Sequence, residues 1–187
     1  VTPQVTSIQN AYGFLKGAVH RVLIQAAGSA ERKELTRAAL DQARGTSRLS
    51  DVIGELFLQD AELGEALMSQ LDHFGTSIIG NLVNSPQEER IVRTIQRLSR
   101  DFLGVPADLL AAIPHSRDFN ASINARTPFL KTSPYSPLAA SLRRLASAIM
   151  EKDVSRLREG RVQLRRSTPK SKAAQVDIGR PLPHVIH

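Results

Sequence analysis

The sequence predicts an α/β fold in which a small, incomplete parallel sheet lies within a mostly helical chain of 187 residues. Two short apolar segments, residues 76–83 and 109–113, have the length and residue content of buried strands. An amphipathic helix is predicted between them, and a helix that joins two strands implies a parallel pair with a right-handed crossover. The other periodic segments have the apolar spacing of amphipathic helices.

The first predicted helix begins in Thr6-Ser7-Ile8-Gln9, which matches a capping box. Its apolar residues recur at steps of three and four: Ile8, Tyr12, Leu15, Val19 and Val22. We expect this helix to end near Ala27-Gly28, because glycine adopts the left-handed conformation that closes many helices. Val1-Thr2-Pro3 has the character of a strand exit, so we expect residues of the same domain to precede Val1 in a longer parent protein.

Residues 28–74 are predicted to be entirely helical. Ala30–Arg44 is rich in alanine and charged residues and is expected to stop at Gly45. Ser50-Asp51 is expected to cap a short helix with the apolar residues Val52, Ile53, Leu56 and Phe57. Asp60 is expected to cap another helix, with Leu63, Leu67 and Leu71 on one face.

The helix between the two strands is predicted from Ser85-Pro86-Gln87-Glu88, which offers a capping serine, a proline at the first helical position and a glutamate at the third. Its predicted apolar face is Ile91, Ile95, Leu98 and Phe102, with Gly104 as the stop.

Beyond the second strand, the sequence predicts a short helix over residues 116–125, a loop in TPFLKTSPYSP and a last helix that opens at Ser136-Pro137. The inward face of the last helix is expected to hold Leu138, Leu142, Leu145 and Ile149. The apolar period fades beyond about Lys152, so we predict one domain over residues 1–152 and a basic, disordered tail over 153–187.

Charge is concentrated in that tail. Residues 151–187 hold nine Lys and Arg against four Asp and Glu, a net charge of +5, whereas residues 1–150 hold sixteen against fourteen, a net charge of +2. A basic tail can contact nucleic acid, an anionic membrane or an acidic protein, and the alternative is a solvated tail without a partner.

Composition excludes several classes of protein. There is no cysteine, which excludes disulfides and thiolate metal sites and fits a reducing compartment. No apolar run approaches the length of about 18 residues that a transmembrane helix needs. The five histidines are scattered, so a metal site is not expected.

A ligand is expected at the carboxyl ends of the two predicted strands, where open parallel sheets bind ligands. The first end carries Asn81 and Asn84, and the second carries Pro114, His115 and Ser116. An asparagine amide offers a donor and an acceptor to a purine edge, and a proline ring offers a flat apolar wall. The alternative is structural: Asn81 pins a loop and Pro114 ends a strand. The sequence contains no G-x-x-x-x-G-K-[ST] or G-x-G-x-x-G motif that would bind phosphates.

Three stretches, taken in order, resemble the C-terminal half of the MinD/ParA-type P-loop ATPases: VTPQVTSIQNAYGFLK, IIGNLVNSPQEER and LLAAIPHSRDFNASINARTPFLKTSPYSPLAASLRRLA. The likeness is greatest to the MinD-like branch that includes FlhG/FleN, the regulators of flagellar number. It covers Val1 to about Lys16 and Thr76 to about Ile149. The resemblance implies an incomplete parallel-sheet P-loop NTPase domain, with residues 28–74 as a helical insertion.

The resemblance also implies a role for the residues at the strand ends. Asn81 takes the place of the family asparagine that contacts adenine, and Pro114 takes the place of the proline that flanks the base. His115 and Ser116 occupy the following turn, where the family often has an acidic residue in place of Ser116. Gln4 stands where the family often has glutamate. The helix from Ser7 lies near the family's face for dimer and partner contacts.

ATP and Mg²⁺ are the implied ligands, but the family's phosphate-binding loop, its two lysines and its switch residues all precede the part that this chain resembles. This chain is therefore not expected to hydrolyse ATP alone. The implied parent is a cytoplasmic ATPase that dimerises on ATP and binds a regulatory protein partner. It is expected to position flagella or the division site. Peripheral attachment at the inner face of the bacterial membrane is a further expectation from the same resemblance. The alternatives are a non-catalytic protein-interaction module and a protein that binds DNA or membrane through the basic tail.

Overall fold

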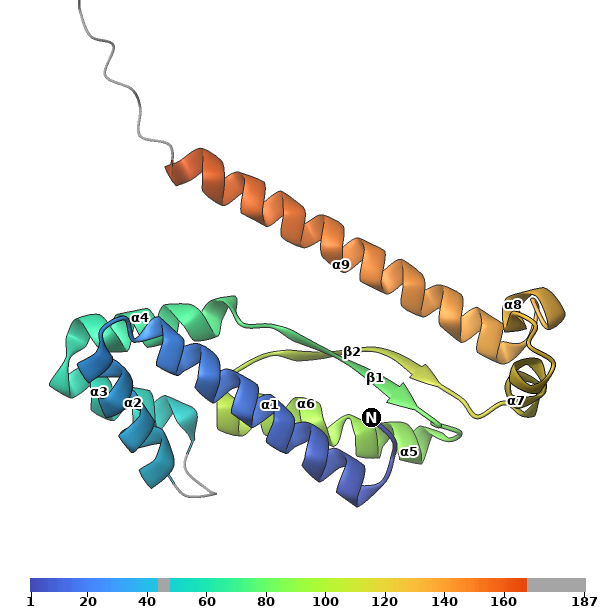
Figure 1. Ribbon diagram of the computed structural model, residues 1–187, viewed down its shortest axis with the longest axis horizontal. Coiled ribbons are helices and arrows are strands. Elements are labelled where there is room, and N and C mark those ends of the chain that lie inside the picture. Colours follow the sequence, from blue (N-terminus) through green and yellow to red (C-terminus); the bar gives the residue numbers. More distant parts are fainter. Residues whose placement is uncertain (44–47, 168–187) are drawn as a thin grey trace, which may run out of the picture. The chain divides into compact units, whose positions relative to one another are not determined.

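The computed structural model describes residues 1–43 and 48–167, with side chains placed as far as residue 152. The chain divides into two units, Val1–Ile149 and Met150–His187, and each is described by itself. The elements are α1 (Val5–Ala26), α2 (Ala30–Gln42), α3 (Leu49–Gln59), α4 (Ala61–His73), β1 (Thr76–Asn81), α5 (Pro86–Val92), α6 (Thr94–Leu98), the π-helix η1 (Ser99–Leu103), β2 (Ala107–Ile113), α7 (Arg117–Asn124), α8 (Phe129–Thr132) and α9 (Pro137–Ser167) (Figure 1).

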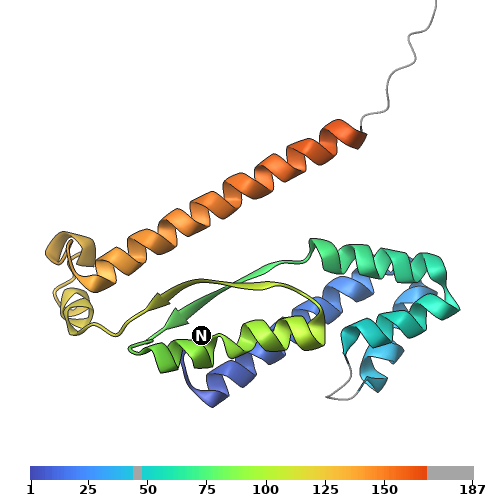
Figure 2. The same ribbon diagram turned by 180° about the vertical axis from the view of Figure 1, so that it is seen from behind.

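The described sheet is a parallel pair, which confirms the predicted strand–helix–strand order. In β1 and β2, Thr76 lies opposite Ala107 and Asn81 lies opposite Ile113, with an irregularity between Ile78 and Ile79. The crossover runs through α5, α6 and η1 (Figure 2). The described part of the chain is therefore helix-rich with a small parallel sheet, which is compatible with an α/β fold.

Val1 lies against the edge of β1 that β2 does not use. Its amino group donates to the carbonyl of Ile79 at 2.9 Å, and the N–H of Asn81 donates to the carbonyl of Val1 at 2.7 Å. These two hydrogen bonds have the pattern of a parallel bridge. The prediction that Val1-Thr2-Pro3 has the character of a strand exit therefore agrees with the hydrogen bonding at Val1.

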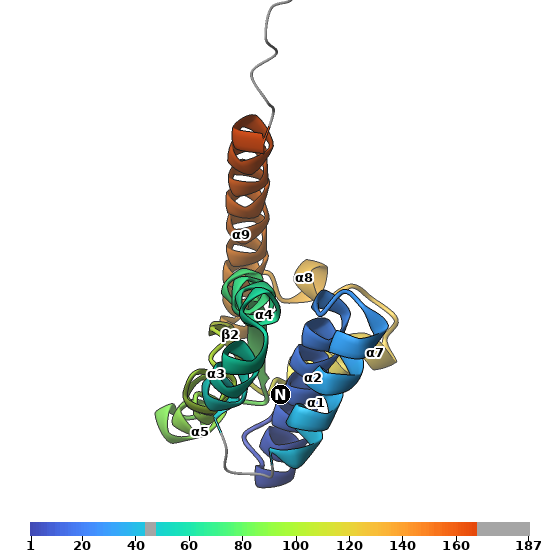
Figure 3. The ribbon, with the colours of Figure 1, turned by 90° about the vertical axis from the view of Figure 1, so that its left-hand side faces the viewer.

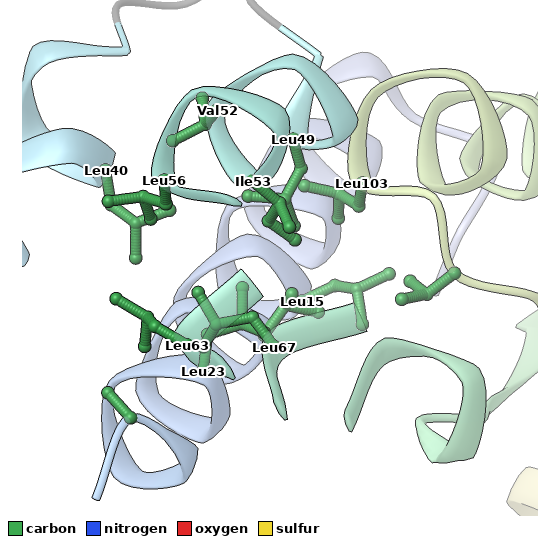
Figure 4. Packing of buried hydrophobic residues seen from close by; sticks show 13 residues of the cluster. Leu15, Leu23, Leu40, Leu49, Val52, Ile53, Leu56, Leu63, Leu67 and Leu103 are labelled. Carbon is green, nitrogen blue, oxygen red and sulfur yellow. The ribbon is translucent and has the colours of Figure 1, made fainter. Parts of the chain in front are cut away.

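Helices α1 to α4 pack around one apolar cluster, and α2, α3 and α4 cover most of the described residues between 30 and 74, which confirms the helical character predicted for this segment. Helix α1 packs against α2 and α4, and α3 packs against α4 (Figure 3). The cluster also receives side chains from η1 and the segment after it (Figure 4). Its members are Leu15, Val19, Leu23, Ala27, Leu40, Leu49, Val52, Ile53, Leu56, Leu63, Leu67, Leu103 and Val105.

Two predicted helix starts are wrong. Helix α1 begins at Val5 without a side-chain cap, and the Ser7 hydroxyl accepts a hydrogen bond from the N–H of Thr2 instead. Ser7 thereby fixes the entry segment rather than the first turn. Helix α3 begins at Leu49, so Ser50 and Asp51 lie inside it; Leu49 is buried, and packing rather than capping sets this start.

Other helix ends are confirmed. Asp60 caps α4, because its Oδ1 accepts from the N–H of Leu63 at 3.0 Å. Helix α1 ends at Ala26, and Gly28 follows with φ +76°, a left-handed conformation that favours glycine. Gly104 closes the crossover with φ +65°. The stop expected at Gly45 lies outside the described residues.

The crossover is not one regular helix, and this shifts its inward face. Buried positions are Val92, Ile95, Ser99 and Leu103, so only Ile95 of the predicted face is fully buried. The helix is interrupted at Arg93 and ends in the wider turn of η1. In a π-helix, residues on one side of the helix are further apart in the sequence than in an α-helix. The apolar period of an α-helix therefore does not predict which residues are buried there.

The last helix is longer than predicted. Helix α9 opens at Pro137, where the Ser136 hydroxyl accepts from the N–H of Ala139, and Leu138 is buried as expected. Ile149 is 41% exposed, contrary to its predicted inward position.

Helix α9 continues to Ser167, so the prediction that structure ends near Lys152 is wrong for residues 153–167. A helix that has already nucleated propagates cheaply, whether or not an apolar period is present. The rest of the predicted tail lies outside the described residues.

The predicted Pro-rich loop contains a short helix, α8, whose Phe129 is buried. Together with Leu138 and Ala139, Phe129 forms a small cluster against which Ile113 and Leu142 pack. Through these contacts the end of β2 reaches the first turns of α9. Within the described ranges, none of the helices combines the length and apolar character needed to cross a membrane.

Candidate nucleotide-base site

A pocket of about 330 Å³ lies at the carboxyl ends of β1 and β2. It brings together four of the five residues that sequence analysis placed at the strand ends, namely Asn81, Pro114, His115 and Ser116, and leaves out Asn84. The remaining lining residues are Leu82, Ile113, Phe119, Asn120, Leu138 and Leu142. The volume is near the lower end of the range of about 300–1,000 Å³ for small-molecule sites, which suits one ring system better than a whole nucleotide.

Asn81 is the last residue of β1, and its side chain serves the turn that follows. Its Oδ1 accepts a hydrogen bond from the N–H of Leu82 at 3.1 Å, and Leu82 has φ 60°. The structural reading of Asn81 as a loop-pinning residue is therefore correct. It does not exclude a binding role, because a carbonyl oxygen has a second lone pair and Nδ2 has no partner among the described residues.

Asn84 joins the two strand ends by hydrogen bonds. Its Oδ1 accepts from the N–H of His115 at 2.9 Å, and its Nδ2 donates to the carbonyl of Leu82 at 3.2 Å. Its own N–H donates to Glu88 Oε2 at 2.5 Å. One side chain thus holds the turn after β1 against the turn after β2, although Asn84 does not line the pocket.

The turn after β2 is fixed by a helix cap. Ser116 precedes α7, and its hydroxyl accepts from the N–H of Phe119 at 3.3 Å, which leaves the hydroxyl proton free to donate. The backbone N–H of His115 is held by Asn84, while the rest of His115 is exposed. Pro114, which lies between β2 and His115 in the sequence, is half-buried.

Sequence reasoning missed the aromatic wall of the pocket. Phe119 is 40% exposed, and its ring meets that of buried Phe129 in an edge-to-face contact, with 5.6 Å between centroids and an angle of 72°. The cap at Ser116 predicts a first helical turn that contains Phe119, and that signal could have identified it. The wall formed by Leu138 and Leu142 has no such signal, because it depends on how α9 packs.

The lining has no Lys, Arg, Asp or Glu, so it offers neither a counter-charge for phosphates nor a carboxylate for a cation. Nowhere in the described ranges do three His, Cys, Asp or Glu side chains gather as a metal site would require. The described carboxyl and imidazole groups with shifted pKa values lie elsewhere: burial lowers the pKa of His20 in α1, and hydrogen bonds lower that of Asp60.

A cavity of about 620 Å³ lies between α2 and α3, and one of its lining residues, Ala43, is the last described residue before a gap in the described chain. The strand-end pocket is therefore the candidate site. No protein-family model matches this chain, and neither a curated protein nor a solved structure matches it.

Proposed function

We propose that this chain forms the adenine side of the nucleotide site in a MinD/ParA-like P-loop ATPase, a protein that acts as an ATP-dependent spatial regulator. The observation that supports this most is the meeting of Asn81, Pro114, His115 and Ser116 in one pocket without Lys, Arg, Asp or Glu, at the carboxyl ends of two parallel strands. The lining combines a few amide and hydroxyl groups with apolar and aromatic walls, the usual chemistry of a base-binding pocket.

In the proposed complex, the Asn81 amide gives the purine its polar contacts. Nδ2 donates to a ring nitrogen, and the second lone pair of Oδ1 accepts from the exocyclic amine, so that Asn81 distinguishes adenine by its donor and acceptor pattern. Pro114 and Phe119 provide apolar surface for the ring. Asn84 acts indirectly, because it holds the two turns at their observed separation.

The phosphates and Mg²⁺ have no ligands in this pocket. They are assigned in this proposal to the phosphate-binding half of the parent ATPase, which supplies the hydrolytic chemistry when ATP is bound. Two observations support such a larger sheet. A two-stranded parallel sheet is small for an α/β domain, and Val1 already forms the bonds of a parallel bridge on the free edge of β1. Hydrolysis by these 187 residues alone is not proposed.

The coding sequence upstream of Val1 tests the ATPase proposal. An in-frame segment that encodes K-G-G-x-G-K-T and ends in a strand is the expected result. A start codon directly before Val1, with no such segment upstream, would overturn the proposal. That outcome would favour a non-catalytic interaction module.

Adenosine binding tests the pocket itself. Saturation-transfer NMR with the 187-residue chain should show transfer to adenosine and less to guanosine, whose edge has a different donor and acceptor pattern. Asn81→Ala and Phe119→Ala should each reduce the signal, whereas Asn124→Ala, an exposed change at the other end of α7, should not. Equal signals for all variants, or equal transfer to both nucleosides, would contradict the assignment.

The rest of the proposal follows from the same resemblance. The parent dimerises on ATP, presents the α1 region to a dimer or regulatory partner, and works in the cytoplasm or at the inner face of the bacterial membrane. Flagellar genes beside the coding sequence would select flagellar number as the regulated process, and division genes would select the division site.

A further inference from the structure

The hairpin of α3 and α4 carries an apolar groove that is separate from the strand-end pocket. The groove has a volume of about 470 Å³ and is lined by residues of both helices and by Gly104 after η1. Its lining residues are Ser50, Ile53, Gly54, Phe57, Met68, Leu71, Asp72 and Gly104. Most of this surface is apolar, and the groove extends along about two helical turns of α3, from Ser50 to Phe57, and about one turn of α4, from Met68 to Asp72.

Large apolar side chains are exposed on this hairpin. Met68 is 54% exposed, Phe57 is 39% exposed, and Leu58 beside Phe57 is 87% exposed. Isolated exposed apolar residues are ordinary, but Phe57 and Met68 both line the groove, so their exposed surface adds to an apolar site of the kind that binds partners. Methionine is common on surfaces that receive helices because its side chain is flexible and polarisable.

The groove is preformed because Gly64 brings α3 and α4 close together. A Cβ atom at this position would lie 2.7 Å from the Cα of Phe57 and 2.5 Å from its ring. The Phe57 bank is thus held against α4 by backbone contact. A partner would not have to open the hairpin, which lowers the free energy cost of binding.

The charge of the hairpin is strongly one-sided. Residues 49–73 contain six carboxylates and no Lys or Arg. Arg32 of α2 binds two of them, Asp60 at 2.7 Å and Glu62 at 2.8 Å. The other four form no ion pair among the described residues: Asp51, Glu55, Glu65 and Asp72. Asp72 lines the groove, and Glu65 stands on the same side of α4 as Met68, one turn earlier.

We propose that this groove binds a basic amphipathic helix of a partner protein. The apolar side of such a helix packs on Phe57, Met68 and Leu71, and its Lys or Arg residues lie near Asp72 and Glu65. Helix-in-groove recognition uses this combination of apolar anchors and complementary charge. The negative charge disfavours two other occupants, an anionic membrane and nucleic acid, and it disfavours a second copy of the same acidic face. The inference rests on the groove alone and does not depend on nucleotide binding.

A designed peptide tests the proposal with the full 187-residue chain. The probe is a fluorescent 18-residue helix of Leu and Lys with Leu at steps of three and four, and its control has Glu in place of Lys. Fluorescence anisotropy should detect the Lys peptide with an affinity that falls as salt rises, and should detect no binding of the Glu peptide. Equal binding of both peptides, or binding of neither, would overturn the proposal.

Variants of the 187-residue chain then distinguish binding of the peptide in the groove from general attraction between opposite charges. Met68→Glu adds a negative charge but removes an apolar anchor, and should weaken binding by about tenfold. Asp72→Asn should weaken binding by roughly threefold, as expected for an exposed charge pair. Glu55→Gln removes the same charge from the other side of α3 and should change the affinity by less than about twofold.

Circular dichroism and urea unfolding would verify that each variant is folded. Tighter binding by Met68→Glu, or equal losses in Asp72→Asn and Glu55→Gln, would show that the peptide responds to diffuse charge and would overturn the proposal. A concentration-dependent dimer that Met68→Glu dissociates would also overturn it, because the groove would then belong to a second copy of this chain.

Discussion

The packed helices α1 to α4 and the strand-end pocket are held by different forces. Among the described residues, thirteen buried apolar residues form the cluster among the helices (Figure 4), whereas three form the cluster at the pocket: Phe129, Leu138 and Ala139. At the pocket, hydrogen bonds of Asn81, Asn84 and Ser116 fix the turns instead. Apolar packing therefore determines the stability of the first region, and polar contacts determine the geometry of the second. Changes in the two regions are expected to have different consequences.

The largest effect is expected from Leu23→Ala. Leu23 is fully buried in α1 and faces the helical cluster, so the truncation should lower the free energy of unfolding by about 2–5 kcal/mol. Urea unfolding followed by circular dichroism at 222 nm measures this change. Leu58→Ala is the matched control, because Leu58 is 87% exposed and should cost about 0.5 kcal/mol or less. Similar losses of unfolding free energy in both variants would contradict the burial of Leu23 in the apolar cluster.

Gly64→Ala tests the close contact of α3 with α4. The added methyl group would meet the backbone of Phe57 at 2.7 Å, which cannot turn away, so the variant should lose about 1–3 kcal/mol. Gly17→Ala makes the same change inside α1. Beyond its chain neighbours and the backbone of its own helix, no atom lies within 4 Å of the added Cβ atom. This variant should therefore gain about 0.5–1 kcal/mol in the free energy of unfolding from helix propensity. The two changes should therefore shift the urea midpoint in opposite directions. A stabilising Gly64→Ala would contradict the packing of the hairpin.

Asn84→Ala separates geometry from stability. The lost hydrogen bonds are exposed, so the free energy of unfolding should fall by about 1 kcal/mol or less. The amide resonances of Leu82 and His115 should nevertheless shift in ¹H–¹⁵N NMR spectra, because the Asn84 side chain no longer joins the two turns and only the bond from the N–H of Val83 to the carbonyl of Ile113 remains there.

Asn84→Asp is the matched variant for this prediction. It keeps the oxygen that accepts from His115 but loses the donor to Leu82. Its shift at His115 should therefore be smaller than that of the alanine variant. Equal shifts in the two variants would show that the bond between the strand ends is not what positions the turns.

The sequence predicts the parts of this fold that local signals specify. Asp60 and Ser85 cap helices where expected, and Gly28 and Gly104 close them. The apolar run at 76–83 contains β1, and the run at 109–113 covers most of β2, which begins two residues earlier at Ala107. Local patterns failed where tertiary contacts decide. Ser7 binds Thr2 instead of capping a helix, and the irregular crossover buries Val92 and Leu103 in place of their neighbours.

The candidate site was predictable for a related reason. Asn81 ends β1, and Pro114, His115 and Ser116 directly follow β2; the topology of a parallel pair places such residues at one edge of the sheet. Leu138 and Leu142 reach the pocket from a helix more than twenty residues later, which no local pattern indicates. Asn84 was grouped with the strand end, but its role as a bridge depends on a bond to a residue 31 positions away.

The smallest expected effect is the pH dependence of the cap on α4. The hydrogen bond from the N–H of Leu63 and then the Arg32 guanidinium lower the pKa of Asp60 below its ordinary value. The folded chain therefore holds this carboxylate charged at a pH where the unfolded chain has begun to protonate it. The resulting stabilisation is complete above the unfolded pKa of about 3.9, and it is lost as the pH falls through the lower folded value.

Asp60→Asn isolates this contribution, because asparagine still caps a helix but cannot titrate or pair with Arg32 by charge. The wild-type chain should unfold at higher urea than the variant at pH 7, and the difference should shrink below about pH 4 and in 1 M salt. If Asp60→Asn has the same pH dependence as the wild-type chain, the bonds to Leu63 and Arg32 do not stabilise the start of α4, and packing alone holds the hairpin.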